Sequence, residues 1–284
     1  MLKRKFCSKL ILLSLFLFHR SLGQVMETED GKPLEHRQIM GEFSGNYETS
    51  TDEKLLTFPI NAGYGISDRI TLELEPTLVT SINLVGDTNE TGIGDFETKL
   101  FYTITDEGKA LPSLAIAGEF KIPIAKNKYI GTGKADFTPI FMAGKTFGRF
   151  SAYVNLRYTF LGKPAGVPVN NFATYDGAVV YTTSNDNFLF AELYGSTSAI
   201  RYIDSTDLTL PSESILENSE FSGGETVFSI GYGYHIHNGI VLSMAGSYSN
   251  TNSLLLRAGI AVETGKKKMR TGIWQKIKNV RKKF

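Results

Sequence analysis

The sequence predicts an all-β protein: a single transmembrane antiparallel up-and-down β-barrel of about twelve strands, with a cleaved N-terminal signal peptide and a short basic C-terminal tail. Three observations support this prediction. Apolar and polar residues alternate along segments long enough for tilted strands to cross a bilayer, which takes roughly 9 to 11 residues. The links between these segments are alternately short and long, and the chain begins with the pattern of a secretory leader.

Residues 1–23 have the three parts of a secretory signal peptide. Four basic residues precede an apolar run at 10–18, and the small-residue site Ser-Leu-Gly follows at 21–23. The run is too short for a membrane anchor, because a spanning helix needs roughly 20 apolar residues. The only cysteine, Cys7, precedes the run, so cleavage after Gly23 would leave a chain without a disulfide.

Charge is distributed unevenly along the chain. Loss of residues 1–23 removes five basic residues and no acidic one, which leaves 25 basic against 29 acidic residues. Nine of those basic residues lie in 266–284, which contains no acid, so the body at 24–265 carries 16 basic against 29 acidic residues. An acidic body speaks against nucleic acid as a partner.

Residues 24–37 are predicted to form an N-terminal periplasmic segment, and residues 38–264 the outer-membrane β-barrel. Period-two alternation recurs in the barrel, with Gly, Asn, Asp or Pro between the candidate strands. The expected strands are 39–49, 54–66, 69–80, 94–104, 113–124, 135–147, 149–161, 172–183, 187–199, 224–236, 239–249 and 253–264.

Every second link between these strands is tight, such as Ser-Asp at 67–68 and His-Asn-Gly at 237–239, whereas the links at 81–93 and 200–223 are long. Outer-membrane barrels have short turns on the periplasmic rim and long loops outside the cell. The alternative is a soluble sandwich, in which the apolar faces pack against each other. Strand length favours the barrel, since strands of soluble domains average about 5 or 6 residues.

The segment 149–160 shows how the two strand faces are assigned. Phe150, Val154 and Leu156 share one face and Arg157 lies on the other. An arginine facing lipid at mid-bilayer costs roughly 2 to 4 kcal/mol, so Arg157 is predicted to face the lumen. The same test on the other strands gives the candidate lumen-lining residues Glu73, Glu75, Glu97, Lys99, Glu119, Lys121, Arg157, Asp176, Glu192 and Arg257. The strand at 135–147 fits least well, because Lys145 shares a face with Phe137 and Phe141.

Several segments together resemble one family of outer-membrane barrels, named for a MetA pathway of phenol degradation. The resembling segments are LTFPINAGYGISDRITLELEPTLV (56–79), GIGDFETKLFYTITDEG (92–108), PSLAIAGEFKIPI (112–124), GTGKADFTPIFMAGKTFGRFSAYVNLRYTF (131–160) and FLFAELYG (188–195). The resemblance implies a transporter-like outer-membrane barrel with no catalytic residues to carry over. Members usually finish on a strand ending in an aromatic residue, whereas here a basic tail follows the last strand.

The predicted function is passive passage of small solutes, including apolar or aromatic ones, through an outer-membrane channel. The predicted inner face carries six acids and four bases, an excess that would favour cations if the lumen is open. The alternative is a closed structural or interaction barrel, whose inner charges cross-link a plugged lumen. The long link at 200–223 could fold inward as a constriction or remain outside as a solvated cap.

No cofactor, metal or catalytic residue is predicted, and an enzyme is not expected. His235 and His237 share a strand face beside a turn, where solvated histidines are ordinary. The DTNETG segment at 87–92 begins like a calcium loop, but position twelve is Thr98 instead of a glutamate. A serine–histidine pair would need a histidine in the middle or outer half of the strands, where none lies.

Residues 265–284 are predicted to form a basic amphipathic tail. Ile273, Ile277, Val280 and Phe284 recur at helical spacing among cations, which is typical of a helix lying on an anionic surface. A disordered basic end is the alternative. The predicted partners are therefore outer-membrane lipid, a small-molecule solute and an anionic envelope surface at 266–284, and the predicted location is the cell outer membrane.

Overall fold

The computed structural model describes residues 26, 28–32, 34–51, 53–84, 88–163, 169–183, 187–197, 224–237 and 239–264. No helix long and apolar enough to span a membrane occurs among them. The strands are β1 (Ile39–Thr49), β2 (Glu53–Ser67), β3 (Ile70–Leu84), β4 (Thr88–Gly92), β5 (Phe96–Thr105), β6 (Ser113–Ile122), β7 (Asp136–Phe147), β8 (Phe150–Thr159), β9 (Phe172–Thr182), β10 (Phe188–Ser196), β11 (Thr226–His237), β12 (Ile240–Ser249) and β13 (Leu254–Thr264).

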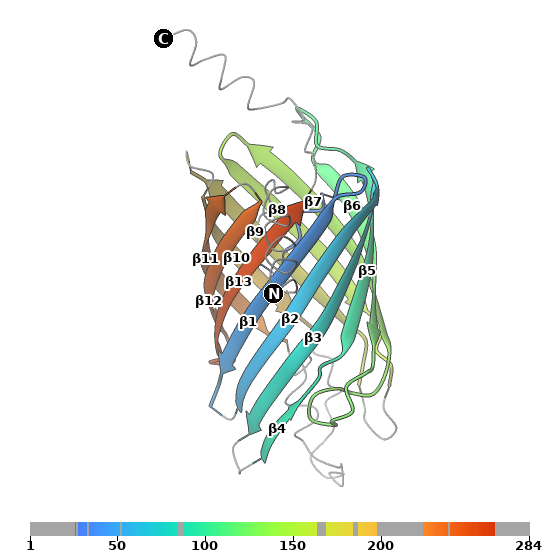
Figure 1. Cartoon of the computed structure of the whole chain (residues 1–284), viewed down its shortest axis with the longest axis vertical. Coiled ribbons are helices and arrows are strands. Elements are labelled where there is room, and N and C mark those ends of the chain that lie inside the picture. The colour runs from blue at the N-terminus through green and yellow to red at the C-terminus, as the bar shows by residue number, and fades with distance from the viewer. Residues whose placement is uncertain are drawn as a thin grey trace, which may run out of the picture.

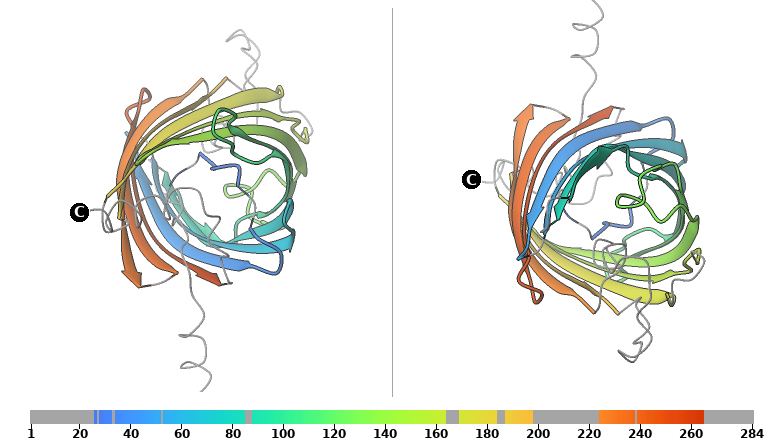
Figure 2. Two further views of the ribbon diagram at one scale, coloured as in Figure 1. Left: turned by 90° about the horizontal axis from the view of Figure 1, so that it is seen from above. Right: turned by 90° about the horizontal axis from the view of Figure 1, so that it is seen from below.

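The strands form one antiparallel sheet that closes on itself (Figures 1 and 2). Apart from β4 and β5, consecutive strands pair with each other, and β1 pairs with β13 over eleven residue pairs from Ile39↔Thr264 to Thr49↔Leu254. β4 and β5 both pair with β3 in the same register and are separated only by residues 93–95. They therefore occupy one place in the ring, and the barrel has twelve strand positions.

All twelve predicted strands are confirmed, with ends that differ by a few residues. Only the link predicted at 81–93 is wrong in part, because β3 continues to Leu84 and β4 pairs with its end. The polar composition of this stretch hid the strand, since the pattern Asn-Glu-Thr-Gly carries no apolar alternation.

The two faces of each strand differ in exposure as the alternation predicts. In β8, Val154 and Leu156 are 51 % and 54 % exposed, whereas Tyr153 and Asn155 are 3 % and 0 % exposed. Large apolar side chains cover the outer surface of the ring along every long strand. Such a surface meets hydrocarbon, because lipid-facing positions in a transmembrane barrel are apolar.

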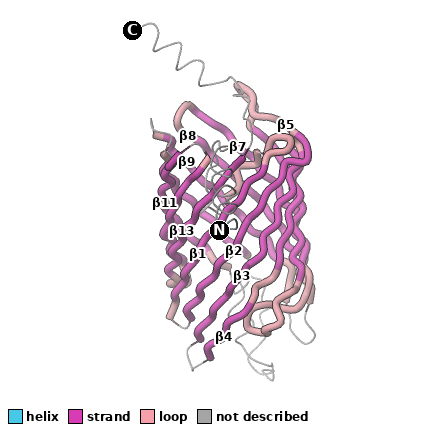
Figure 3. The backbone as a smooth tube through the Cα atoms, in the orientation of Figure 1, coloured by secondary structure: helices cyan, strands magenta, loops and turns pink. Residues whose placement is uncertain are grey.

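The two rims of the barrel are unequal, as Figures 1 and 3 show. The start of β1 and the end of β13 lie at one rim, together with the two-residue turns after β2, β7 and β11. We call it the terminal rim. The links 85–95, 123–135, 160–171 and 197–225 join strand ends at the opposite rim, which is called the loop rim. Short turns beside the chain termini are typical of the periplasmic side.

Lys145 has the outward position on β7 that the sequence indicates, in line with the exposed Phe137 and Phe141. Its ammonium group lies at the terminal rim and donates hydrogen bonds to three carbonyl oxygens of the β5–β6 link, at 2.6 Å to Gly108 and 3.1 Å to Lys109 and Leu111. The charge is therefore held at the rim, away from lipid, which explains how an apolar strand face accommodates a lysine.

The free-energy cost of a charged side chain on the outer face should depend on its depth in the bilayer. Val154 lies midway along β8, and Phe147 lies at the terminal rim. We expect Val154→Arg to lower the free energy of unfolding by about 2 to 4 kcal/mol and Phe147→Arg by no more than about 1 kcal/mol. Urea unfolding of the protein in phospholipid vesicles measures both values, and equal effects at the two depths would contradict a lipid-facing outer surface.

Candidate functional site

The described N-terminal residues lie inside the barrel. They comprise Met26, 28–32 and 34–38, drawn in dark blue within the ring in both end-on views of Figure 2, and are called the lumen segment. Starting from β1 at the terminal rim, the segment runs back into the interior. The sequence pattern indicates a periplasmic location for 24–37 and contains no signal for this inward path.

Two adjacent residues of the lumen segment contact walls on different sides of the ring. The Thr28 backbone N–H and hydroxyl donate hydrogen bonds to one oxygen of Glu192 on β10, at 2.5 Å and 2.6 Å. The Glu29 carboxylate forms an ion pair with Lys99 on β5. Thr28 is 0 % exposed and Glu192 is 1 % exposed, so the segment covers this carboxylate completely.

Gly31 and Lys32 lie against the walls formed by β6, β7 and β8. A Cβ on Gly31 would stand 3.2 Å from the Met142 Cβ, so the segment passes close to the wall there. The Lys32 ammonium lies 6.0 Å from the centroid of the Tyr153 ring and 3.2 Å from the Glu107 carboxylate in the β5–β6 link.

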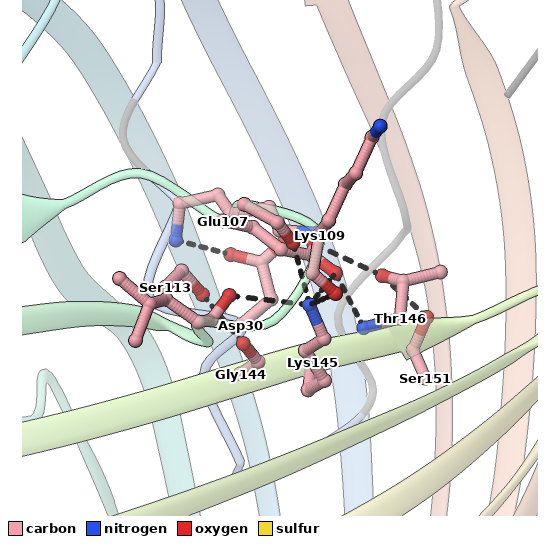
Figure 4. A network of polar contacts seen from close by, with 11 residues as sticks. Asp30, Glu107, Lys109, Ser113, Gly144, Lys145, Thr146 and Ser151 are labelled. Atoms are coloured by element: carbon pink, nitrogen blue, oxygen red, sulfur yellow. Dashed lines mark hydrogen bonds and ion pairs between the residues drawn. The ribbon is translucent and has the colours of Figure 1, made fainter. Parts of the chain in front are cut away.

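The β5–β6 link ties the lumen segment to the rim, as Figure 4 shows. Burial alone would raise the pKa of the Glu107 carboxyl, but the Thr146 N–H at 2.6 Å and the Lys32 ammonium outweigh it and lower that pKa. Burial alone would lower the pKa of Lys32, but the carboxylates of Asp30 and Glu107 raise it. The pair therefore stays charged at neutral pH, and its contribution is lost as the pH falls through the lowered Glu107 pKa or rises through the raised Lys32 pKa.

The rest of the lumen segment follows β2, β3 and β13. The Leu34 N–H donates a hydrogen bond to the Thr71 hydroxyl on β3 at 2.8 Å. Gln38 is buried and its side-chain amide donates to the Glu263 carboxylate on β13. The contacts of the segment thus reach β2 and β3, β5 to β8, β10 and β13, most of the circumference of the barrel.

The inner wall formed by β5 to β12 is largely apolar near the terminal rim. Two clusters of buried residues lie there: Phe101, Ala115, Ala117, Ile140 and Met142; and Tyr153, Ala178, Val180, Phe188, Phe190, Val241 and Ala245, with Met26 packed against the second. Phe188 and Phe190 stand opposite Gly233 and Gly231 on β11, whose missing side chains leave space for the rings. The lumen segment therefore rests on an apolar surface.

The inner wall toward the loop rim is charged. Lys99 contacts Glu119 at 3.4 Å, and Arg157 on β8 contacts Asp176 on β9 at 3.3 Å. Lys121 on β6 forms an ion pair with Asp136 on β7 and lies 3.9 Å from Asp95. On the far side, Arg257 of β13 donates a hydrogen bond at 3.1 Å to the Tyr194 hydroxyl of β10. We call these residues the charged belt.

The ten residues selected from the sequence lie at inner-face positions of their strands, and all are buried or half-buried. Register brings several of them together: Glu73 stands opposite Lys99, Lys99 opposite Glu119, and Glu97 opposite both Glu75 and Lys121. Glu192 and Arg257 lie away from these pairs, and each contacts a residue that the sequence pattern does not indicate, Thr28 and Tyr194 respectively.

The structure adds six polar residues to that set: Thr28, Glu29, Lys32, Asp95, Asp136 and Tyr194. Asp136 and Tyr194 could have been found, because they share a strand parity with Thr138 and Phe190, which are buried. The lumen segment has no periodicity, so its charges could not be placed.

Four sequence predictions concern residues outside the described part of the chain. These are the signal peptide at 1–23, the loop at 200–223, Asp87 of the calcium-like segment and the tail at 265–284. A bulge separates His235 from His237 on β11. Within the described ranges, no three His, Cys, Asp or Glu side chains are grouped so as to hold a metal ion.

A family model described as "Putative MetA-pathway of phenol degradation" matches residues 32–206, more than half of the chain. The chain belongs to this family. The match begins within the lumen segment and includes β1 to β10 of this family member. No curated protein sequence matches the chain significantly.

Solved structures show the same fold at low sequence identity. The COG4313 outer membrane channel from Pseudomonas putida F1 is 13 % identical, with a TM-score of 0.65 over 84 % of this chain and 99 % of that one. The NanC porin is 13 % identical, with a TM-score of 0.53 over 78 % and 98 %. A KdgM porin in complex with disordered oligogalacturonate is 9 % identical, with a TM-score of 0.50 over the same shares.

The family member is therefore an outer-membrane β-barrel. Its ring is closed, so backbone hydrogen bonds are made within the sheet, and its outer surface is apolar, as a lipid-embedded barrel requires. The cell outer membrane is its location, and membrane lipid contacts its outer face.

The Arg157–Asp176 pair should contribute measurably to stability, because the Asp176 side chain is 0 % exposed. We expect Asp176→Asn to lower the free energy of unfolding by about 3 kcal/mol, since it leaves a poorly solvated arginine. The double variant Arg157→Met/Asp176→Leu should lose less, because both charges are removed. Urea unfolding in vesicles measures the cycle, with the exposed Asp106→Asn as control; additive single effects would show that the pair is not coupled.

Proposed function

We propose that this family member is a channel for passive passage of small solutes across the outer membrane, without covalent chemistry or energy coupling. The observation that carries the proposal is the inner wall itself. Its charged belt lines the interior of a barrel whose twelve strands lie between the filled eight-stranded barrels and the sixteen-stranded porins with open channels. The channels and porins with the same fold support this function.

The interior offers two environments in series. A solute entering at the loop rim would meet the charged belt and then the apolar, aromatic wall around Phe101, Phe188 and Phe190. This order suits small solutes with both polar and apolar parts, including aromatic ones, which agrees with the pathway in the family's name. The acid excess on the charged wall favours cations over anions.

Ion conductance in planar bilayers tests the proposal directly. A channel gives discrete current steps, and a KCl gradient should give a reversal potential of the sign for cation preference. Replacing two inner carboxylates together, Glu75→Gln/Glu97→Gln, should move that potential toward zero, whereas Asp106→Asn on the exposed β5–β6 link should not.

A folded protein without current steps would instead favour the second candidate, a closed structural barrel. Two observations support this second candidate. The ion pairs of the charged belt join neighbouring strands, and the lumen segment occupies part of the interior. Discrete current steps with a reversal potential that indicates anion preference would agree with a channel. They would refute the role given to the inner carboxylates.

A further inference from the structure

Four aromatic rings lie together on the outer face of the barrel, where β6, β7 and β8 reach the loop rim. Phe120 lies near the end of β6, Phe137 near the start of β7, and Phe160 directly after β8. Ring centroids are 4.7 Å apart for Phe120 and Phe137, and 6.3 Å apart for Phe137 and Phe160. Tyr158 and Phe160 are 5.1 Å apart. We call these four residues the aromatic shelf.

The backbone beneath the aromatic shelf fixes the rings beside one another. A Cβ on Gly118 would stand 3.3 Å from the Phe137 ring and 3.9 Å from the Phe120 ring, so the two rings lie over this glycine. Phe137 and Phe160 exchange two backbone hydrogen bonds, at 3.1 Å and 2.8 Å. The four shelf side chains are 37 % to 51 % exposed, so they present a continuous aromatic surface to the membrane. Aromatic residues at a rim lie where acyl chains meet headgroups.

Two exposed lysines border the aromatic shelf at the loop rim. Lys134 precedes Phe137 by three residues, and Lys163 follows Phe160 by three residues. The two segments are in contact, because a Cβ on Gly162 would stand 2.8 Å from the Lys134 Cβ. The two ammonium groups therefore belong to one small area of the rim, next to the rings.

The acid of this area is turned inward. Residues 120–137 and 158–163 contain one acid, Asp136, and five lysines. Asp136 is 7 % exposed, forms an ion pair with Lys121 and accepts a hydrogen bond at 2.8 Å from the Gly162 N–H. Among the residues that the structure describes, neither Lys134 nor Lys163 forms an ion pair. The exposed charge beside the aromatic shelf is therefore positive.

We propose that the aromatic shelf, with Lys134 and Lys163, is a binding site for a phosphorylated lipid of the outer leaflet. The acyl chains of the lipid lie on the rings, and its phosphates accept hydrogen bonds from the two ammonium groups. Long loops mark the extracellular rim, so the site faces the outer leaflet. Basic residues beside a membrane-facing surface bind anionic headgroups, whereas rings alone accept any lipid. The site lies outside the barrel and does not depend on whether the lumen conducts.

Native mass spectrometry of the purified protein in detergent counts bound lipids and gives their Kd. The ligands are lipid A with two phosphates, the same lipid without phosphate, and phosphatidylethanolamine. Lys134→Gln/Lys163→Gln removes both charges from the site. Lys54→Gln is the matched control, because Lys54 is also exposed and lies at the loop-rim end of β2, away from the aromatic shelf. Heat-modifiable migration in gels verifies that each variant is a folded barrel.

Lys134→Gln/Lys163→Gln should raise the Kd for lipid A about tenfold or more, because each lysine beside an anionic lipid contributes to binding. Removal of the phosphates from the lipid should have a similar effect, and Lys54→Gln should have none. Salt at roughly 0.5 M should weaken binding to the unaltered protein more than to the double variant, because salt screens exposed charges.

Phe160→Ala tests the aromatic shelf separately, and its position after the end of β8 leaves the strand itself unchanged. It should raise the Kd for lipid A while the two lysines remain. Inorganic pyrophosphate, which has phosphates but no acyl chain, should not displace lipid A at an equal concentration. An unchanged Kd in Phe160→Ala, or displacement by pyrophosphate, would overturn the role of the rings.

Three other results would overturn the site. The first is an unchanged Kd for lipid A in Lys134→Gln/Lys163→Gln. The second is equal affinity for phosphatidylethanolamine, which would leave an aromatic girdle without headgroup preference. The third is an equal loss of affinity in Lys54→Gln, which would show a diffuse attraction to the whole loop rim.

Discussion

The need to pair every backbone N–H and C=O group in hydrocarbon is the constraint on which the rest of the structure depends. An unpaired group in lipid costs several kcal/mol, and a sheet satisfies all of its groups there only when it closes. The pairing of β1 with β13 provides that closure. Once the ring is closed, each side chain faces either lipid or the interior, so lipid determines the outer residues and leaves the inner ones free to serve function.

The inner wall has two regions of different polarity. On β5 to β12 near the terminal rim it is apolar, and aromatic rings lie over glycines of the neighbouring strand. Toward the loop rim it is charged, and its lysines and arginines stand close to carboxylates. The lumen segment joins the two regions, because Met26 packs on the apolar wall while Thr28 and Glu29 bond to charged residues. A wall of this kind can hold a peptide without a covalent bond.

Much of the fold was predictable because a strand buried on one side has an unambiguous period of two. Arg157 identified the inner face of β8, and the same reasoning assigned Asp176 and Glu192 to inner positions. The prediction failed at β4, whose residues are polar throughout, and in β10 only Glu192 distinguished the inner face, since apolar residues occupy both faces of that strand. A pattern of polarity carries information only where the two faces differ.

The sequence by itself determined that the protein is a barrel, approximately where twelve of its strands lie, and that side chains such as Arg157 and Asp176 are turned away from lipid. These are local properties, set by the alternation along one strand and the cost of a charge in hydrocarbon. Only the tertiary structure decided that Arg157 meets Asp176 and that Thr28 and Glu29 reach Glu192 and Lys99. Those contacts depend on the stagger of the strands and on the return of an aperiodic segment into the interior. Thr28 and Glu192 are 164 positions apart, so a local sequence pattern cannot predict their contact.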